Sequence, residues 1–149
     1  MSIAIIDQSM DENVAQLMAQ VARLMRRAFD EKARTIGMTR PQWQVISLLA
    51  MNEGINQGGL ADLLDVEPIT LGRMIDRLQE GNFVERRPDP ADRRAWRLHL
   101  TDKARGLLEL LRPMALETAE AAQEGLNAEQ RELLVRTLVQ MRTNLSRKA

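Results

Sequence analysis

The stretch VERRPDPADRRAWRLHLT, residues 84–101, holds five arginines, although the whole chain has a formal net charge of zero. Guanidinium groups bind phosphates, and those on loops enter the minor groove of A·T-rich DNA, where negative potential is concentrated. In the triplet Asp92-Arg93-Arg94, we expect the aspartate to hold Arg93 and brace the loop, while Arg94 reaches into the groove. The chemistry that these residues predict is therefore DNA binding.

A second set of candidate side chains begins at Pro68, where the pattern indicates the start of a helix. The second helix of a helix-turn-helix presents its first turns to base edges in the major groove. The candidates in these turns are Pro68, Ile69, Thr70, Arg73 and Arg77. The fork of an arginine matches the O6 and N7 acceptors of guanine, and we expect Arg73 to make that contact.

Ion pairs within the helix are the alternative for both arginines. Asp76 follows Arg73 by three residues and Glu80 follows Arg77 by three, and residues at this spacing are neighbours on a helix surface. The sequence favours this pairing more for Arg77 than for Arg73.

Gly72 also has two interpretations, because glycine inside a helix costs about 1 kcal/mol relative to alanine. It marks either close packing against a neighbouring helix or close approach of the helix to DNA.

The elements around these residues follow the order of a winged helix-turn-helix. A short helix over 58–64, a tight break at 65–67 and a helix over 68–80 that stops at Gly81-Asn82 form the helix-turn-helix pattern. Segments 83–87 and 96–100 read as paired strands. In the second strand, alternation places Trp96, Leu98 and Leu100 on one face and Arg97 and His99 on the other. The loop between the strands is longer than a structural hairpin needs, which favours a functional role.

Long amphipathic helices are predicted on both sides of this centre. The first covers about 11–36 and ends at Gly37, and a second, capped by Thr39 with Pro41 in its first turn, ends at 52–54. After the hairpin, a helix that starts at Asp102 reaches about 125, with a bend expected at Pro113.

The last helix opens at Asn127 and carries an apolar stripe of Leu134, Leu138, Met141 and Leu145. Little of the chain is left to cover the stripes of the first and last helices, so a second copy is the expected cover.

The predicted fold is thus mainly α: a winged helix-turn-helix with a two-stranded wing and long N- and C-terminal dimerisation helices. We expect an N-terminal dimerisation arm over 1–36, a DNA-binding domain over 37–101 and C-terminal dimerisation helices over 102–149, joined in one intertwined unit.

Composition argues against several other classes of protein. The chain of 149 residues has no cysteine, which excludes disulfides and thiolate metal sites. Its single histidine, His99, falls on the outward side of a wing strand, and no nucleophile motif, phosphate loop or metal-ligand cluster is present. We therefore expect no enzyme activity, no cofactor and no metal.

The opening MSIAIIDQSM lacks the basic flank of a signal peptide, and no apolar run approaches the length of a membrane span. We expect a cytoplasmic protein that has no membrane partner. A winged-helix protein-interaction module or anti-repressor without sequence-specific DNA binding is the alternative function.

The segment LADLLDVEPITLGRMIDRLQEGNFVERRPDPADRRAWRLHLTDKA resembles the DNA-binding core of the MarR/SlyA family of transcription regulators. The resemblance implies a homodimer that binds a pseudo-palindromic operator in double-stranded DNA, usually as a repressor. It implies that Arg73 reads the major groove and that Arg94 enters the minor groove. Asn82-Phe83 replaces the usual Gly-Leu, so the turn into the wing is expected to differ, and the absence of cysteine excludes the peroxide-sensing branch.

Members of this family commonly bind small aromatic carboxylates or phenols between the arms and the DNA-binding domain, which weakens DNA binding. The positions that correspond to that pocket are Arg26, Trp43 and Arg86. Two arginines can clamp a carboxylate and a tryptophan can supply an apolar wall. Simple burial in the core is the alternative for Trp43.

Overall fold

The computed structural model describes residues 10–146. Its elements are, in order, α1 (Met10–Arg34), α2 (Arg40–Met51), α3 (Gln57–Leu64), α4 (Pro68–Glu80), β1 (Val84–Pro88), β2 (Trp96–Leu100), α5 (Asp102–Ala122) and α6 (Ala128–Ser146). The predicted fold class is confirmed, with each predicted boundary within a few residues of the observed one. The parts of the expected arms before residue 10 and after residue 146 lie outside the described residues.

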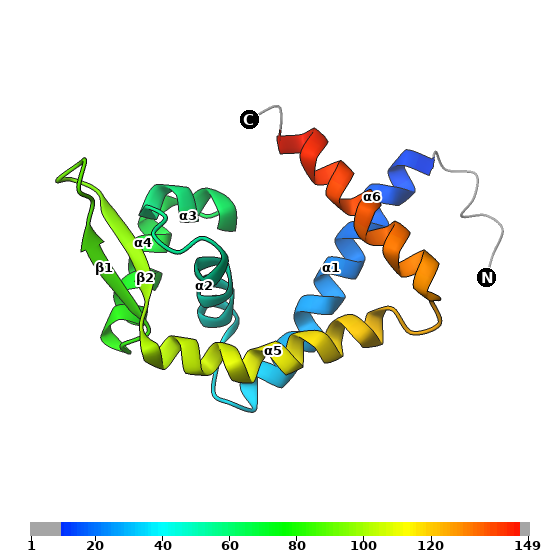
Figure 1. Cartoon of the computed structure of the whole chain (residues 1–149), viewed down its shortest axis with the longest axis horizontal. Coiled ribbons are helices and arrows are strands. Elements are labelled where there is room, and N and C mark those ends of the chain that lie inside the picture. Colours follow the sequence, from blue (N-terminus) through cyan, green and yellow to red (C-terminus); the bar gives the residue numbers. More distant parts are fainter. Residues whose placement is uncertain (1–9, 147–149) are drawn as a thin grey trace.

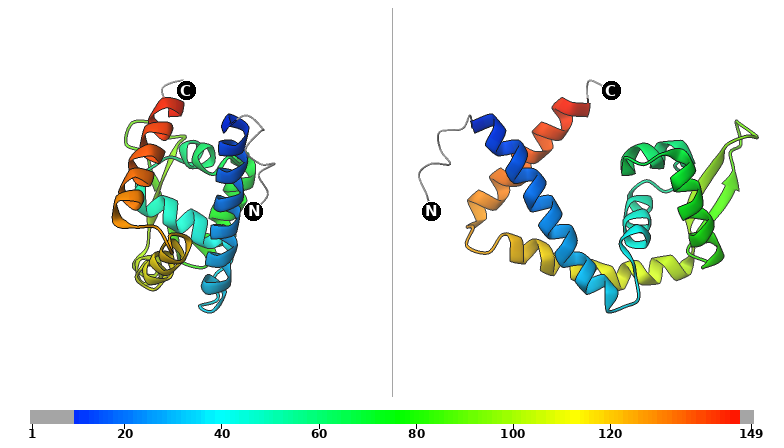
Figure 2. Two further views of the ribbon diagram at one scale, coloured as in Figure 1. Left: turned by 90° about the vertical axis from the view of Figure 1, so that its right-hand side faces the viewer. Right: turned by 180° about the vertical axis from the view of Figure 1, so that it is seen from behind.

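Helix α5 forms the base of the molecule (Figure 1). At one end of it stands the lobe, which consists of α2, α3, α4 and the β1–β2 hairpin. Of the two arms, α1 crosses α5 near its middle and α6 follows from its other end. The views in Figure 2 show that α1 and α6 stand on the same side of α5. Within the described part of the chain, every helix is too short or too polar to cross a membrane.

The helix-turn-helix is defined by local hydrogen bonds at its turn. Asn56 caps α3, because its Oδ1 accepts the Gly59 N–H at 2.7 Å. Asp65 ends α3 in the left-handed conformation with φ 54°, which aspartate tolerates better than most residues. Pro68 then opens α4 at a position that needs no N–H donor. The tight break that the sequence predicts between the two helices is therefore confirmed.

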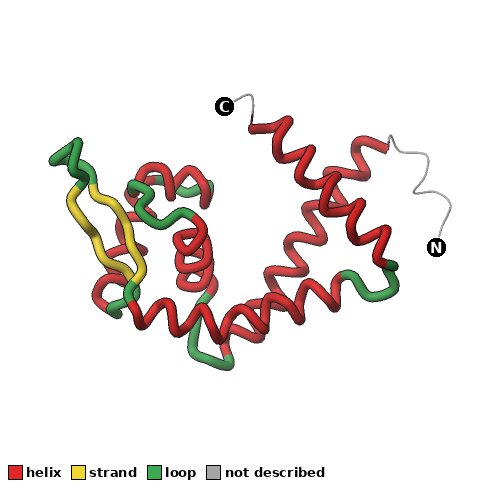
Figure 3. Tube along the Cα trace, viewed as in Figure 1, coloured by secondary structure: helices red, strands yellow, loops and turns green. Residues whose placement is uncertain are grey.

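The wing is an antiparallel hairpin in which Val84 pairs with Leu100 and Pro88 with Trp96. Figure 3 shows the two strands projecting from the helices of the lobe. The first strand begins one residue later than predicted, because Asn82 is left-handed (φ 62°) and the Phe83 N–H still donates to Leu78 O at 2.8 Å. Asparagine thus provides the turn conformation expected of it.

The base of the wing is attached to the segment before α3. The Leu98 N–H donates to Ile55 O at 2.9 Å, and the Gly54 N–H donates to Leu98 O at 2.8 Å. Leu98 and Leu100 are buried, as alternation predicts, but Trp96 is 46% exposed. Trp96 lies at the end of β2 next to the loop, beyond these attachments.

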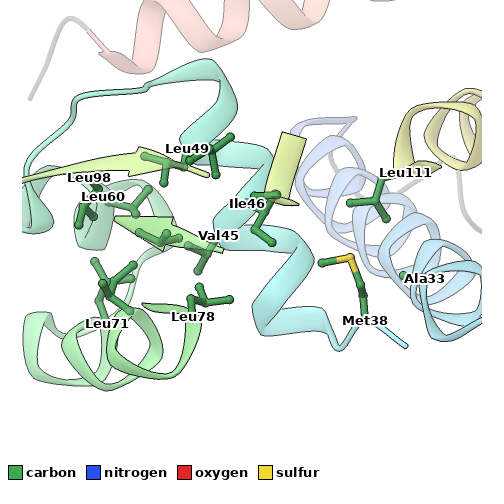
Figure 4. Close-up of a cluster of buried hydrophobic side chains, with 14 of the residues drawn as sticks. Ala33, Met38, Val45, Ile46, Leu49, Leu60, Leu71, Leu78, Leu98 and Leu111 are labelled. Carbon is green, nitrogen blue, oxygen red and sulfur yellow. The ribbon is translucent and has the colours of Figure 1, made fainter. Parts of the chain in front are cut away.

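The core of the lobe is built by α2, α3, α4 and β2. Figure 4 shows Val45, Ile46 and Leu49 of α2 among Leu60, Leu71, Leu78 and Leu98. Trp43 is only half-buried beside this cluster, so the simple core interpretation does not describe it fully. Its ring meets Phe29 edge-on at a centroid distance of 4.6 Å, and its Nε1–H donates to Asp30 Oδ1 at 2.7 Å.

Asp30 is the polar link between α1 and α2. Its Oδ2 accepts a hydrogen bond from Arg40 Nε at 2.7 Å, while its other oxygen accepts the bond from Trp43. The hydrogen bonds from Arg40 lower the pKa of Asp30, although burial acts in the opposite direction. This carboxylate therefore stabilises the junction of arm and lobe in its charged form.

Helix α6 differs from the other helices, because none of its 19 residues is buried against its own chain. Its direction is set at the turn after α5 by Arg131. The guanidinium donates to Leu126 O at 3.0 Å, Gln123 O at 2.9 Å and Glu120 at 2.8 Å. Asn127 opens α6 as predicted, with its Oδ1 accepting the Gln130 N–H at 2.8 Å.

The Asp30 link generates a stability prediction. Asp30→Asn keeps an acceptor for Trp43 but removes the charge, so the free energy of unfolding should fall by about 1–2 kcal/mol and Tm by about 3–6 °C at neutral pH. Because the folded pKa is lowered, the contribution is present above the ordinary pKa of about 3.9 and is lost as pH falls through the folded value. Thermal unfolding at several pH values tests this.

The difference in Tm between the wild type and Asp30→Asn should narrow toward low pH. Glu31→Gln is the matched control, since Glu31 is an exposed neighbour on α1 that makes no ion pair among the described residues. A difference that stays constant with pH would show that the Asp30 charge is not the stabilising feature.

Candidate nucleic-acid interface

The five arginines of the hairpin divide into paired and unpaired groups. Arg86 pairs with Asp76 at 2.7 Å, Arg87 with Glu85 at 3.0 Å, and Arg97 with Asp89 at 3.1 Å. Arg93 and Arg94, at the tip, are exposed and make no ion pair with any residue in the range 10–146. The wing therefore presents two uncompensated guanidinium groups at its end.

The loop is braced, but the expected pair of Asp92 with Arg93 is wrong. Asp89 supplies the brace instead: it binds Arg97 across the hairpin, and its Oδ1 accepts the Ala91 N–H at 2.8 Å. The Ala91 N–H and then Arg97 lower the pKa of Asp89. The signal in the sequence was the Asp89-Pro90-Ala91 triplet, which is typical of a turn closed by an aspartate side chain.

Asp92 has a local role in the same loop. Its Oδ1 accepts the backbone N–H of Arg94 at 3.0 Å, and its carbonyl accepts the Ala95 N–H at 3.1 Å. The Asp89 N–H donates in turn to Ala95 O at 3.1 Å. Asp92 therefore orients the backbone of Arg94 and leaves both neighbouring guanidinium groups unpaired.

Helix α4 buries one face and exposes the other. Leu71, Ile75 and Leu78 are buried in the lobe. The five candidates of the sequence analysis are all exposed, and Ile69 has 74% of its surface accessible. They are Pro68, Ile69, Thr70, Arg73 and Arg77. The structure thus places these five side chains on the outward side of α4.

The intrahelical ion pairs that were the alternative for α4 are not formed. The nearest partner of Asp76 is Arg86 of the wing, at 2.7 Å. Neither Arg73 nor Arg77 takes part in an ion pair within the described range. Both arginines are available for a ligand that approaches α4.

For Gly72 the structure supports the packing interpretation. A Cβ at this position would lie 3.1 Å from Gln57 Nε2 on α3, closer than ordinary van der Waals contact. The Gly72 carbonyl also accepts a hydrogen bond from Arg86 Nη2 at 3.3 Å. Gly72 therefore lies where α3 and the wing strand come close to α4.

The three expected ligand residues are not gathered around one cavity. Arg26 is exposed on α1, Trp43 contacts Phe29 and Asp30, and Arg86 binds α4. Arg86 does line an open cavity of about 500 Å³ together with Gln57, Gln79 and Trp96. Sequence reasoning missed Trp96 as a lining residue, because it assigned this side chain to the buried face of β2.

A helix-turn-helix followed by an arginine-tipped hairpin defines a winged helix-turn-helix protein of the kind that binds DNA. Residues 38–96 match the MarR family. A curated relative, the uncharacterized HTH-type transcriptional regulator YybA of Bacillus subtilis, is 25% identical over 91% of this chain and 90% of its own length. Residues 38–96 thus form a winged helix of the MarR type, and the chain as a whole is similar to transcriptional regulators.

Solved structures agree with this assignment. A MarR transcriptional regulator from Methanosarcina mazei is 26% identical and superposes with a TM-score of 0.83 over 93% of this chain and 99% of its own. The transcriptional regulator SlyA is 25% identical, with a TM-score of 0.77 over 91% and 95% of the two chains. A mutant E. coli MarR complexed with operator DNA, 23% identical with a TM-score of 0.74 over 91% and 99%, has the same fold.

Proposed function

We propose that the protein acts as a homodimer that binds a pseudo-palindromic operator in double-stranded DNA. In each subunit α4 enters the major groove, where Arg73 contacts a guanine, and Pro68, Ile69, Thr70 and Arg77 line the rest of the contact. The wing enters the adjacent minor groove through Arg94, with Arg93 beside it and Asp92 orienting the loop. The proposal includes a cytoplasmic location and repression, since a dimer that covers its operator blocks other proteins from the same DNA.

The observation that carries this proposal is the pattern of ion pairing. Three carboxylates of the lobe, those of Asp76, Glu85 and Asp89, pair with Arg86, Arg87 and Arg97 respectively. The arginines left unpaired among the described residues of α4 and the hairpin are those that a duplex would meet on α4 and at the wing tip. Unpaired guanidinium groups on adjacent elements suit a ligand with regularly spaced phosphates and base acceptors. A mutant E. coli MarR with the same fold forms a complex with operator DNA, which supports DNA as the ligand of this fold.

The dimer is proposed from the arms. No residue of α6 is buried, yet the helix exposes large apolar side chains, including Leu134 (40%) and Leu138 (41%). An apolar groove of about 560 Å³ runs between α1, α5 and α6. A second copy with the same exposed faces covers such a surface by two-fold symmetry.

Release from DNA by a small aromatic carboxylate or phenol is a finer part of the proposal. The cavity that Arg86 and Trp96 line supports it, since a guanidinium beside an indole suits an aromatic acid. Arg26 and Trp43 remain candidate contributors to ligand binding, through surfaces that the dimer would complete.

The rival function is a winged-helix interaction module or anti-repressor without sequence-specific DNA binding. Selection of bound fragments from genomic DNA, followed by gel shift at low salt, separates the two. Retention of a common sequence motif supports the regulator, and absence of binding at low salt would favour the interaction module.

Base reading by Arg73 is tested by substitution. Arg73→Ala should weaken binding to the selected operator by about 1–3 kcal/mol and relax preference at one base pair in each half-site. Competition binding with single-base variants of the operator measures the base preference.

The wing contact is tested by Arg94→Ala. This variant should bind DNA more weakly, and the slope of log affinity against log salt concentration should fall by about one. Titrations at several salt concentrations give the salt slope.

The control for Arg73 is Arg112→Ala, which removes an exposed arginine of α5 outside the proposed interface. An equal loss of affinity for operator and random DNA in Arg73→Ala would contradict base reading by this residue.

Dimerisation through α6 is tested by Leu138→Asp, which places a charge in the apolar groove. Sedimentation should show a dimer for the wild type and a monomer for this variant, because burying an unpaired carboxylate is unfavourable. Gln140→Glu, also on α6 but outside the groove lining, is the control and should stay dimeric. A dimer that survives Leu138→Asp would place the interface elsewhere.

The ligand proposal predicts that sodium benzoate lowers the affinity for operator DNA more than sodium acetate at the same concentration and ionic strength. The difference isolates the aromatic ring from the general effect of salt on DNA binding. Fluorescence anisotropy of a labelled operator provides the measurement. Equal effects of the two salts would argue against an aromatic acid as the ligand.

A further inference from the structure

The Arg86 side chain connects the wing to the helix-turn-helix: its hydrogen-bond and ion-pair partners all lie on α3 and α4. Arg86 lies on β1, opposite Leu98, with only 18% of its side chain exposed. Its Nη1 lies 2.7 Å from Asp76 Oδ1 and donates to Gln79 at 2.8 Å. Its Nη2 donates to Gln57 at 3.4 Å and to the Gly72 carbonyl at 3.3 Å. The guanidinium is therefore held in place independently of any single partner.

Asp76 is the only one of these partners that carries a charge. Its position on α4 allows it to pair with either Arg86 or Arg73. It follows Arg73 by three residues, and side chains at that spacing are neighbours on a helix. Asp76 is 61% exposed, so its side chain is free to turn toward Arg73. In the structure it pairs with Arg86, and Arg73 has no ion pair among the described residues.

From this geometry we infer that Arg86 is a positioning residue for DNA recognition: by holding the Asp76 carboxylate, it keeps the Arg73 guanidinium available to a base. The inference rests on the proposed function, since it needs Arg73 to read a base. Without Arg86, Asp76 competes for Arg73, and its uncompensated charge also repels the phosphates beside α4. Arg86 thus acts on base reading through Asp76 and without touching the base.

The expected effect is modest, because an exposed pair at this spacing on a helix is weak. Capture of Arg73 by Asp76 should reduce the discrimination at the base pair that Arg73 reads by about twofold. The effect of also removing Asp76 is more informative than the size of the loss. If capture by Asp76 is the cause, then removing Asp76 as well must restore the discrimination.

The experiment measures competition between the operator and the same operator changed at the Arg73 base pair. Arg86→Gln should lose about half of the discrimination. Asp76→Asn alone should keep it, and the double variant Arg86→Gln/Asp76→Asn should recover the wild-type value. Arg87→Gln is the matched control, because it removes a neighbouring β1 arginine that pairs with Glu85 and leaves Asp76 occupied.

A purely structural role for Arg86, or a direct phosphate contact by it, predicts a different pattern. In both cases the double variant would discriminate as poorly as Arg86→Gln or bind worse, and that result would overturn the inference. If Arg86→Gln proves unfolded by thermal melting, Arg86→Lys replaces it. Lysine keeps the charge for Asp76 but cannot make all the other bonds, so discrimination should remain near the wild-type value, and its loss would overturn the inference.

The same measurements separate this inference from the proposed function. If the wild type shows no base preference that Arg73→Ala removes, base reading itself fails and the inference fails with it. If that preference exists but Arg86→Gln leaves it unchanged, only the role of Arg86 is refuted.

Discussion

The burial of one stripe of α4 determines which side chains the protein offers to DNA. Leu71, Ile75 and Leu78 recur at helical spacing and pack into the lobe, so the rotation of α4 about its axis is determined by the core. Arg73 and Arg77 then lie on the opposite side of the helix and face outward. A shift of this stripe by one position would rotate α4 by about 100° and move Arg73 from the outward side to the flank of the helix. The packing of the core thus also determines the orientation of the surface that contacts DNA.

A chain with no net charge can still leave arginines unpaired on one surface, because some of its acids pair with other arginines nearby. Asp76, Glu85 and Asp89 each pair with an arginine of the hairpin. These exposed or half-exposed pairs contribute little to stability. Their larger consequence is that they compensate the three arginines of the two strands, whereas Arg93 and Arg94 in the loop have no ion-pair partner within residues 10–146.

The sequence predicted the helices and the hairpin well, because these depend on periodicity and on local capping signals. Asn56, Asn127 and Thr101 cap helices through contacts three residues away, and such contacts are readable from sequence. The exposure of Trp96 was not readable, since alternation describes a strand face and not how far the core extends beneath it.

Ion-pair partners were the least predictable feature. Adjacency suggested Asp92 with Arg93 and helical spacing suggested Asp76 with Arg73. The actual partners, Arg97 for Asp89 and Arg86 for Asp76, are brought together by hairpin pairing and by the packing of β1 against α4. Arg26, Trp43 and Arg86 illustrate the same limit, since a cavity depends on distances between elements that no local pattern records.

In the proposed dimer, the arms would determine how the two lobes are placed relative to each other. Within a proposed dimer, the spacing of the two α4 helices depends on every joint between the lobe and the interface. Those joints are polar and specific: Asp30 joins α1 to α2, Lys32 of α1 pairs with Glu117 of α5 at 3.1 Å, and Arg131 closes the turn from α5 to α6. Two-fold symmetry requires half-sites about 34 Å apart, one helical turn of DNA. Hinged joints would not hold such a spacing, so in the proposed dimer these hydrogen-bonded joints contribute to DNA recognition together with the arginines.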